Sequence, residues 1–213
     1  ADIYNGPGLA GVPRGAVKNL RIITYHFSYQ NMGGLLGIVG VDGPWDIKQV
    51  LGTVPVNPDG STKFTIPAST PVAFQPLDAD GRALQLMRSW TTGMPGETLQ
   101  CNGCHEPQNT AAARGMTTAL VATPFEIEPW YGPRRGFSYA REVQPIIDRY
   151  CVGCHDGNSL TPGGTQLVSL SGSEFVENYH SISPGQGTNH VQKDSHFSVG
   201  YFELQRYCRR PGI

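Results

Sequence analysis

The stretch Leu20–Phe27, with the sequence LRIITYHF, sets the expected fold of this 213-residue chain. Its β-branched and aromatic side chains favour an extended strand. Further stretches of the same kind follow, each bounded by turn residues. They are Val50–Val56, Thr62–Ile66, Val72–Leu77 and Ala83–Met87. Short strands at regular spacing predict a β-sandwich or a small barrel in the N-terminal part of the chain.

Two four-residue segments are expected to form tight turns between these strands. Asn57–Gly60 has the sequence NPDG and Asp78–Gly81 has the sequence DADG, both typical of hairpin turns. The second segment could also begin a calcium loop, but an EF-hand loop has glycine at its sixth position and glutamate at its twelfth. Here the glycine comes fourth, which favours the hairpin turn.

The overall composition predicts a folded, loop-rich protein. The chain has 27 glycines and 17 prolines, while apolar and aromatic residues recur throughout it. Its 16 basic and 17 acidic residues give a net charge of -1, so nothing favours binding to nucleic acid or to an anionic membrane surface. No apolar run is long enough for a transmembrane segment.

Two C-x-x-C-H motifs carry the strongest chemical signal. They are Cys101–His105, with the sequence CNGCH, and Cys151–His155, with the sequence CVGCH. Two thiols three residues apart on one helical turn can add to the two vinyl groups of one porphyrin, and the imidazole of the next residue can then bind the iron. The motifs therefore predict two covalently bound haem c groups. The cofactor-binding residues would be Cys101, Cys104, His105, Cys151, Cys154 and His155, with His105 and His155 as proximal iron ligands.

Three other uses of these cysteines stay open. The four could bind one zinc ion, although the 46 residues between Cys104 and Cys151 exceed the usual spacing of a zinc ribbon. A thioredoxin-like redox site would need a βαβ pattern near one motif, and the sequence shows none. Two disulfides could form in an oxidising compartment, but a gap of two residues makes a strained ring.

Covalent haem attachment also predicts where the protein works. The machinery that attaches c-type haem acts outside the cytoplasmic membrane, so we expect a periplasmic or equivalent extracytoplasmic location. The chain has no signal peptide, begins at Ala1 without an initiator Met, and stops soon after the helix-like sequence around Cys208. We therefore expect a fragment of a longer polypeptide, in which Cys208 is a small buried hydrophobe.

The chain is expected to have three parts. Residues 1–95 form a β-rich domain that includes an N-terminal arm, residues 1–16, rich in glycine and proline. Residues 96–136 hold the first haem motif and a linker. Residues 137–213 form a second haem region, which is cytochrome c-like, loop-rich and partly α-helical. The predicted fold class is thus mixed, with a sandwich-like β-rich domain followed by the cytochrome region.

A short amphipathic helix is expected to lead into the second motif. Ser138 can cap this helix, and Pro145 should mark either its start or a kink. One face of the helix would carry the apolar side chains and deliver Cys151. These side chains are Val143, Ile146, Ile147 and Tyr150.

The sixth ligand of each iron decides between electron transfer and catalysis. A second His or a Met closes the iron, whereas an open position allows ligand binding. The candidate distal ligands are His26, in the first strand-like stretch, and His180, His190 and His196, in the polar stretch after the second motif. The alternative is a packed core residue at His26 and solvated loop residues at the other three positions.

Several of these segments resemble the middle domain of the hydrazine synthase alpha subunit. They are residues 20–67, Arg82–Trp90, and Pro95–Asn109 around the first motif. Glu126–Pro133 and Phe137–Gly157 are also similar to large multidomain relatives of that subunit, which occur mainly in planctomycete-type bacteria. The relatives continue past the equivalent of Ile213, in agreement with the expected fragment.

The resemblance has an implication for the first haem. In that family one alpha-subunit haem is catalytic: a Tyr four residues after the motif His binds its iron, while that His turns to a zinc ion. The corresponding position here is Asn109, and an amide does not replace a phenolate as an iron ligand. The departure implies that His105 is an ordinary proximal ligand, which favours electron transfer at the first haem.

The leading hypothesis is a dihaem c-type cytochrome that mediates electron transfer in a larger redox protein or complex. Its partners would be redox proteins or other subunits. A haem-based oxidoreductase of small nitrogen compounds is the alternative that the resemblance suggests, by analogy alone. A third possibility is a structural docking module in a cytochrome assembly.

Overall fold

The computed structural model describes residues 2–25, 48–87, 89–105, 109, 115–176 and 197–208. Residues 205–208 are described by their main chain only. The described residues form two compact units, which are treated separately. The first holds those up to Gly136, and the second holds those from Phe137 onward. The three-part division of the chain stays a prediction. No helix in these described ranges is long and apolar enough to cross a membrane.

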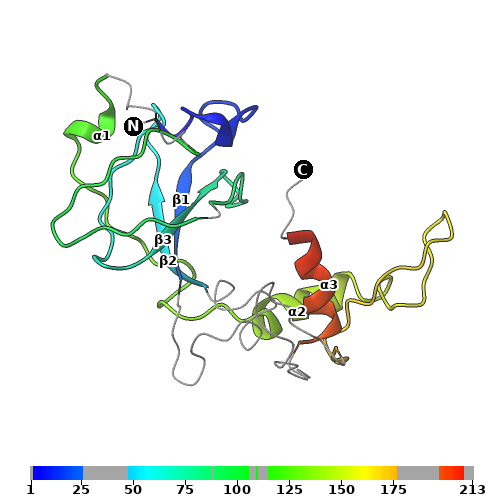
Figure 1. The fold of residues 1–213 in the computed structure, drawn as a ribbon. Coiled ribbons are helices and arrows are strands. Elements are labelled where there is room, and N and C mark those ends of the chain that lie inside the picture. Colours follow the sequence, from blue (N-terminus) through cyan, green and yellow to red (C-terminus); the bar gives the residue numbers. More distant parts are fainter. Residues whose placement is uncertain are drawn as a thin grey trace. The chain divides into compact units, whose positions relative to one another are not determined.

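A three-stranded antiparallel sheet organises the first unit (Figure 1). Its strands are β1 (Asn19–Tyr25), β2 (Lys48–Pro55) and β3 (Val72–Leu77), in the spatial order β2-β1-β3. Ile22 in the middle of β1 lies opposite Gly52 of β2 and Phe74 of β3. Because β1 is hydrogen-bonded along both edges, it is the central strand. Three of the predicted strands are confirmed.

The core of this unit draws on all three strands. Leu20, Ile22, Leu51, Val54 and Val72 are buried together. Burying one such aliphatic side chain contributes about 1.5–3 kcal/mol to stability. This cluster is therefore the main apolar support of the unit that carries the first motif.

A β-bulge and a glycine shape the outer edge of β2. The register shifts between Ile22 and Ile23, so β2 has one extra residue there. Beside the bulge, Gly52 has a φ of 149°, and a side chain on it would overlap the main chain of Glu128. Thr53 and Glu128 exchange main-chain hydrogen bonds of 2.9 and 3.0 Å. The segment around Glu128 thus covers an edge that would otherwise be open to pairing with another chain.

Two further predicted strands are wrong. Thr62–Ile66 contributes only a parallel bridge between Phe64 and Phe125, and Ala83–Met87 contributes only a bridge to Leu77. The partner of Thr62–Ile66 across the Asn57–Gly60 turn would be β2, but the outer edge of β2 is hydrogen-bonded to Glu128. Phe64 therefore packs its side chain against the core without joining the ladder, and its ring meets that of Phe74 edge to face at 5.7 Å.

The turns before those two segments are formed as predicted. The N–H of Gly60 donates to the carbonyl of Asn57 at 2.8 Å, and the N–H of Gly81 donates to the carbonyl of Asp78 at 3.2 Å. The mixed, β-rich fold class is confirmed. Within the described residues its β part is one three-stranded sheet.

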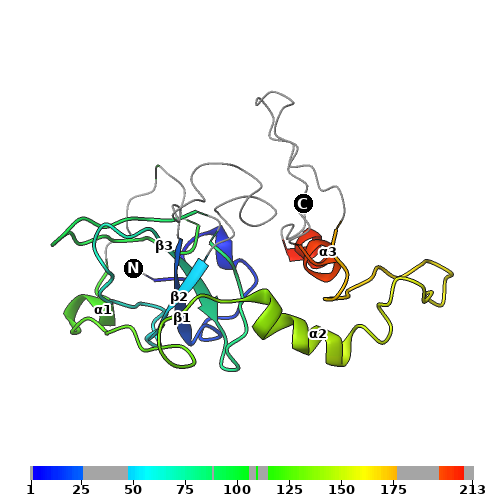
Figure 2. The ribbon, with the colours of Figure 1, turned by 90° about the horizontal axis from the view of Figure 1, so that it is seen from below.

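Short helices build the second unit (Figure 2). They are the π-helical turn η3 (Tyr139–Val143), α2 (Gln144–Tyr150) and α3 (Val199–Cys208). Pro145 lies in the first turn of α2, where its missing N–H costs nothing, so the helix does begin near it. The capping prediction for Ser138 is wrong, because its side chain makes no cap hydrogen bond. Instead the Ser138 N–H donates to the Glu142 carboxylate at 3.2 Å.

Two valines of the first unit give a matched test of its core. Val54 is 1% exposed in β2, whereas Val121 is 75% exposed. We expect Val54→Ala to lower the free energy of unfolding by about 2 kcal/mol, because it removes buried methyl groups and leaves a cavity. Val121→Ala should change it by less than about 0.5 kcal/mol. Denaturant unfolding of the full chain measures both, and equal effects would contradict the assigned core.

Candidate functional site

The first C-x-x-C-H motif lies in the first unit on backbone that is not helical. Cys101 and His105 are exposed, and Cys104 is half-buried. His105 has a φ of 57°, a left-handed conformation that few non-glycine residues adopt. Burial raises the pKa of the Cys104 thiol. The helical turn that the spacing suggests is therefore absent at Cys101–His105, and something else must hold this motif in shape.

The N-terminal arm holds it. The main-chain N–H of Cys104 donates to the Ile3 carbonyl at 3.0 Å, and the Gly8 N–H donates to the Cys104 carbonyl at 3.1 Å. Gly8 is in the middle of η1 (Pro7–Leu9), a single turn of 3-10 helix. Both main-chain polar groups of Cys104 are thus satisfied by the arm.

Three glycines make this close approach possible. A Cβ on Gly6 would lie 2.8 Å from the Cys104 carbonyl oxygen, and a Cβ on Gly8 would lie 2.7 Å from the Cys104 Sγ. Gly103, inside the motif, has a φ of 129°, and a Cβ there would overlap the Asn5 carbonyl. From the sequence, residues 1–16 are recognisable only as an arm rich in glycine and proline. The available signal was the pair of glycines at positions 6 and 8, which is common in loops of any kind.

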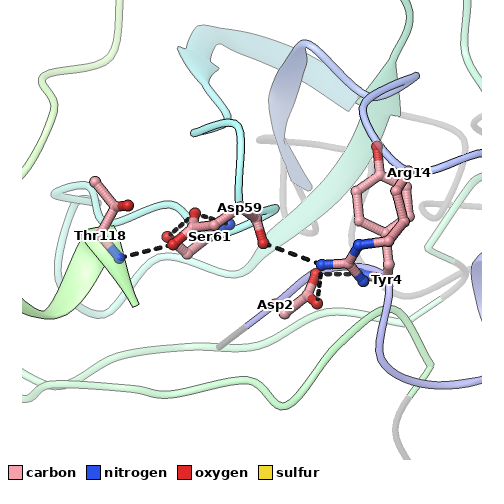
Figure 3. A network of polar contacts seen from close by, with 6 residues as sticks. All are labelled: Asp2, Tyr4, Arg14, Asp59, Ser61 and Thr118. Carbon is pink, nitrogen blue, oxygen red and sulfur yellow. Dashed lines mark hydrogen bonds and ion pairs between the residues drawn. The ribbon is translucent and has the colours of Figure 1, made fainter. Parts of the chain in front are cut away.

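A polar network fastens the base of the arm (Figure 3). The Arg14 guanidinium pairs with the Asp2 carboxylate at 2.6 Å and donates to the Asp59 carbonyl at 3.3 Å. The Asp2 carboxylate also accepts from the Tyr4 N–H at 3.0 Å, and the Tyr4 hydroxyl accepts from the Val17 N–H at 2.8 Å. These contacts join both ends of the arm to the turn at Asn57–Gly60.

The same turn holds the segment that follows the motif. The Asp59 carboxylate accepts from the Ser61 hydroxyl at 2.6 Å, the Ser61 N–H at 3.0 Å and the Thr118 N–H at 2.7 Å. Thr118 is the first residue of α1 (Thr118–Val121). The Ser61 oxygen, fully buried, accepts from the Ala119 N–H at 3.1 Å. These hydrogen bonds hold the pKa of Asp59 well below its usual range. The Ser61 hydroxyl has the largest effect and the Thr118 N–H the next largest.

The second motif is held differently, by its own helix. The chain continues from α2 with helical hydrogen bonds, from the Cys151 N–H to Ile147 and from the His155 N–H to Cys151, both of 2.8 Å. The Cys154 N–H also donates to Cys151, at 3.1 Å. Cys151 is half-buried and Cys154 is exposed. The predicted arrangement of two thiols on one turn at the end of a short helix is present here.

The imidazole of His155 has one buried ring nitrogen. Its Nδ1 atom is buried and has no hydrogen-bond partner. The His155 carbonyl accepts from the Leu170 N–H at 2.9 Å. The Leu170 carbonyl in turn accepts from the buried Gln144 side chain at 3.0 Å. Nε2 is consequently the ring nitrogen that remains for a metal ion.

An apolar stripe runs along α2 to the second motif. Ile146 and Tyr150 are 57% and 71% exposed. The two side chains share one face of α2, and Cys154 follows four residues after Tyr150 in the turn that continues the helix. Of the predicted apolar face, Val143 and Ile147 are half-buried, whereas Ile146 and Tyr150 are exposed. A large apolar group joined to Cys154 would lie beside this exposed pair, so this site fits a porphyrin.

The other predicted site residues fall outside what the structure describes. His26, His180, His190 and His196 lie outside the described residues, and so does the side chain of Cys208. Asn109 is described as an exposed turn residue. The distal ligands stay a prediction.

The alternative uses of the cysteines gain no support. Within the described part of the chain, no disulfide joins the motif cysteines. In that part of the chain, no three or more His, Cys, Asp or Glu side chains form a group that could hold a metal ion. Each motif belongs to its own compact unit, as expected for two separate sites.

Fold and motifs together define a class: a β-rich domain and a short-helix region, each presenting one C-x-x-C-H sequence. Residues 15–106 match the family described as the hydrazine synthase alpha subunit middle domain. This segment contains the whole three-stranded sheet and the first motif. The resemblance expected from the sequence is confirmed for this part of the chain.

Two comparisons extend beyond that segment. The chain is 23% identical over 190 residues to the hydrazine synthase subunit alpha of Kuenenia stuttgartiensis, which covers 62% of this chain and 23% of that protein. It also matches the solved structure of Kuenenia stuttgartiensis hydrazine synthase with a TM-score of 0.56 and 21% identity, covering 78% of this chain and 28% of the other. The chain thus spans about a quarter of its relative, and the structural match concerns the fold alone.

The third residues of the two motifs form a matched pair of variants. A Cβ on Gly103, which has a positive φ, would overlap the Asn5 carbonyl. A Cβ on Gly153 would point into open space. We expect Gly103→Ala to lower the free energy of unfolding by about 3 kcal/mol, because it combines backbone strain with a forced separation of the arm. Gly153→Ala should change it by less than about 1 kcal/mol. Denaturant unfolding of both full-length variants tests this, and a tolerated Gly103→Ala would contradict the packed arm.

The carboxylate of Asp59 gives a prediction about pH. Its pKa is lowered in the folded chain, so its contribution is fully present above the ordinary carboxyl pKa of about 4 and is lost as the pH falls from there toward the folded value. Asp59→Asn should cost about 1 kcal/mol at pH 7, and the difference from the parent should shrink steadily below about pH 4. Thermal unfolding between pH 2 and pH 7 measures this. A difference that is independent of pH would sink the assignment.

Proposed function

We propose that the chain binds two haem c groups, one on each C-x-x-C-H motif, and passes electrons through them. The observation that carries this proposal is the second motif. There, the two thiols lie at a helix end near the exposed side chains of Ile146 and Tyr150, and Nδ1 of the His155 imidazole is buried. The first motif has the same two cysteines and histidine, but on a backbone that is not helical.

The chemistry of attachment requires only the residues that the motifs contain. A thiol adds across a vinyl group, so that the sulfur bonds to the inner carbon while the proton passes to the outer carbon, and no oxidant is consumed. Cys101 and Cys104 would hold one ring, and Cys151 and Cys154 the other. His105 and His155 would each supply a proximal nitrogen. The bound iron supplies a one-electron couple, and the protein fixes the position and surroundings of each ring.

The proposal places the protein outside the cytoplasmic membrane, where c-type haem is attached, and in contact with other subunits. The relative from Kuenenia stuttgartiensis is named as a subunit, subunit alpha, of hydrazine synthase. This supports other subunits or redox proteins as partners. It also supports a role for this chain like that of a hydrazine synthase subunit.

A second candidate function is a haem-based oxidoreductase of small nitrogen compounds. It rests on the match of residues 15–106 to the hydrazine synthase alpha subunit middle domain. Asn109 weighs against it at the first motif, because an exposed amide stands where the resemblance expects an iron-binding phenolate. We therefore favour electron transfer. A docking role for the β-rich unit is compatible with either function.

Covalent haem at each motif can be measured separately. The full chain, produced with c-type haem attachment machinery, should yield two haem-bearing peptides by mass spectrometry, one for each motif. The double variant Cys101→Ser with Cys104→Ser should lose only the first haem, and Cys151→Ser with Cys154→Ser only the second. Absence of covalent haem from the parent would refute the proposal.

Spectra of the loaded protein distinguish the two functions. Low-spin, six-coordinate iron at both sites, unreactive to carbon monoxide after reduction, is the result expected for electron transfer. A high-spin site that binds carbon monoxide would contradict electron transfer there. Turnover of nitric oxide or hydroxylamine by such a protein would establish the oxidoreductase.

A further inference from the structure

The two motifs differ in what fixes their second cysteine. At the second motif the Cys154 N–H bonds within the motif, to Cys151 at 3.1 Å. At the first motif the Cys104 N–H bonds outside it, to Ile3 at 3.0 Å, and the Cys104 carbonyl accepts from Gly8 at 3.1 Å. The arm thus supplies for the first motif the main-chain support that a helix supplies for the second.

The arm also lies against the sulfur itself. The position that a Cβ would occupy on Gly8 is 2.7 Å from Cys104 Sγ, closer than real Cβ contacts allow. The main chain of Gly8 therefore closes one side of the sulfur and limits the rotamers of the Cys104 side chain. A sulfur held in this way can form its thioether only in the directions that the arm leaves open.

The arm is held in place independently of the motif. Arg14 pairs with Asp2 at 2.6 Å and reaches the Asp59 carbonyl at 3.3 Å, as Figure 3 shows. Tyr4 fixes the Val17 N–H at 2.8 Å. These contacts join the arm to the Asn57–Gly60 turn and to Val17, and so hold residues 2–9 from outside the motif.

We propose that the N-terminal arm forms one wall of the first haem site and that Gly8 is a positioning residue for the Cys104 thioether. This inference rests on the proposed function, since it assumes that haem is attached at Cys101 and Cys104. It goes further in assigning a role to residues before the motif. Gly8 acts through the Cys104 sulfur, whose direction decides whether both thiols can reach one ring.

The test compares two glycine substitutions in the first unit. Gly8→Ala places a methyl group against both the sulfur and the main-chain carbonyl of Cys104, whereas Gly136→Ala points into open space, and neither glycine has a positive φ. We expect Gly8→Ala to reduce the fraction of first haem joined at Cys104 by roughly tenfold, because a displacement of about 1 Å can cost a reaction up to a hundredfold. Gly136→Ala should keep both thioethers.

The readouts are structural and do not depend on activity. Peptide mass spectrometry counts thioethers at each motif, and the absorption band of the reduced haem moves to longer wavelength when one vinyl group stays conjugated. In Gly8→Ala both signals should change for the first haem and stay constant for the second. Two intact thioethers at the first motif, with an unchanged spectrum, would overturn the inference. A parent without haem at that motif would instead refute the proposed function.

Hydrogen exchange on unsubstituted residues of the arm gives a second test that does not depend on the folding of Gly8→Ala. The parent loaded with haem is compared with the haem-free double variant Cys101→Ser with Cys104→Ser. Amide exchange in residues 2–9 should be at least about tenfold slower in the loaded protein, because contact with the ring stabilises the arm. Equal exchange rates in the two proteins would count against a wall formed by the arm.

Discussion

Cys104 is hydrogen-bonded through both its main-chain N–H and its carbonyl to the N-terminal arm, and the backbone shape of the first motif depends on these two hydrogen bonds. The Cys104 N–H donates to Ile3, and its carbonyl accepts from Gly8. Main chains can approach this closely only where side chains are missing, as they are at positions 6, 8 and 103. A short glycine-rich segment at one end of the chain thus becomes part of a site far along the sequence.

The two motifs are examples of the same chemistry on unlike supports. At Cys151–His155 the hydrogen bonds are local and continue the helix that precedes them. At Cys101–His105 they are non-local and come from the N-terminal arm. The shape of the first motif therefore depends on a distant segment, whereas that of the second depends mainly on the helix that precedes it.

The family match and the support of the first motif only partly coincide. Residues 15–106 match the hydrazine synthase alpha subunit middle domain, and they include the whole sheet. The arm residues that bond Cys104 come before this segment. Asn109, where the resemblance expects a tyrosine, comes after it. The family match thus covers the sheet and the first motif, while Ile3, Gly8 and Asn109 lie outside it.

The sequence by itself determined the two motifs, three strands, the turns and the helix that begins near Pro145, because each depends on spacing or composition within a few residues. It could not determine that Thr62–Ile66 stays outside the sheet, since that depends on the distant Glu128 pairing with the outer edge of β2. Nor could it show that Gly8 meets Cys104. Glycines in a loop carry no mark of what they approach, and only the tertiary structure brings that main chain against the sulfur.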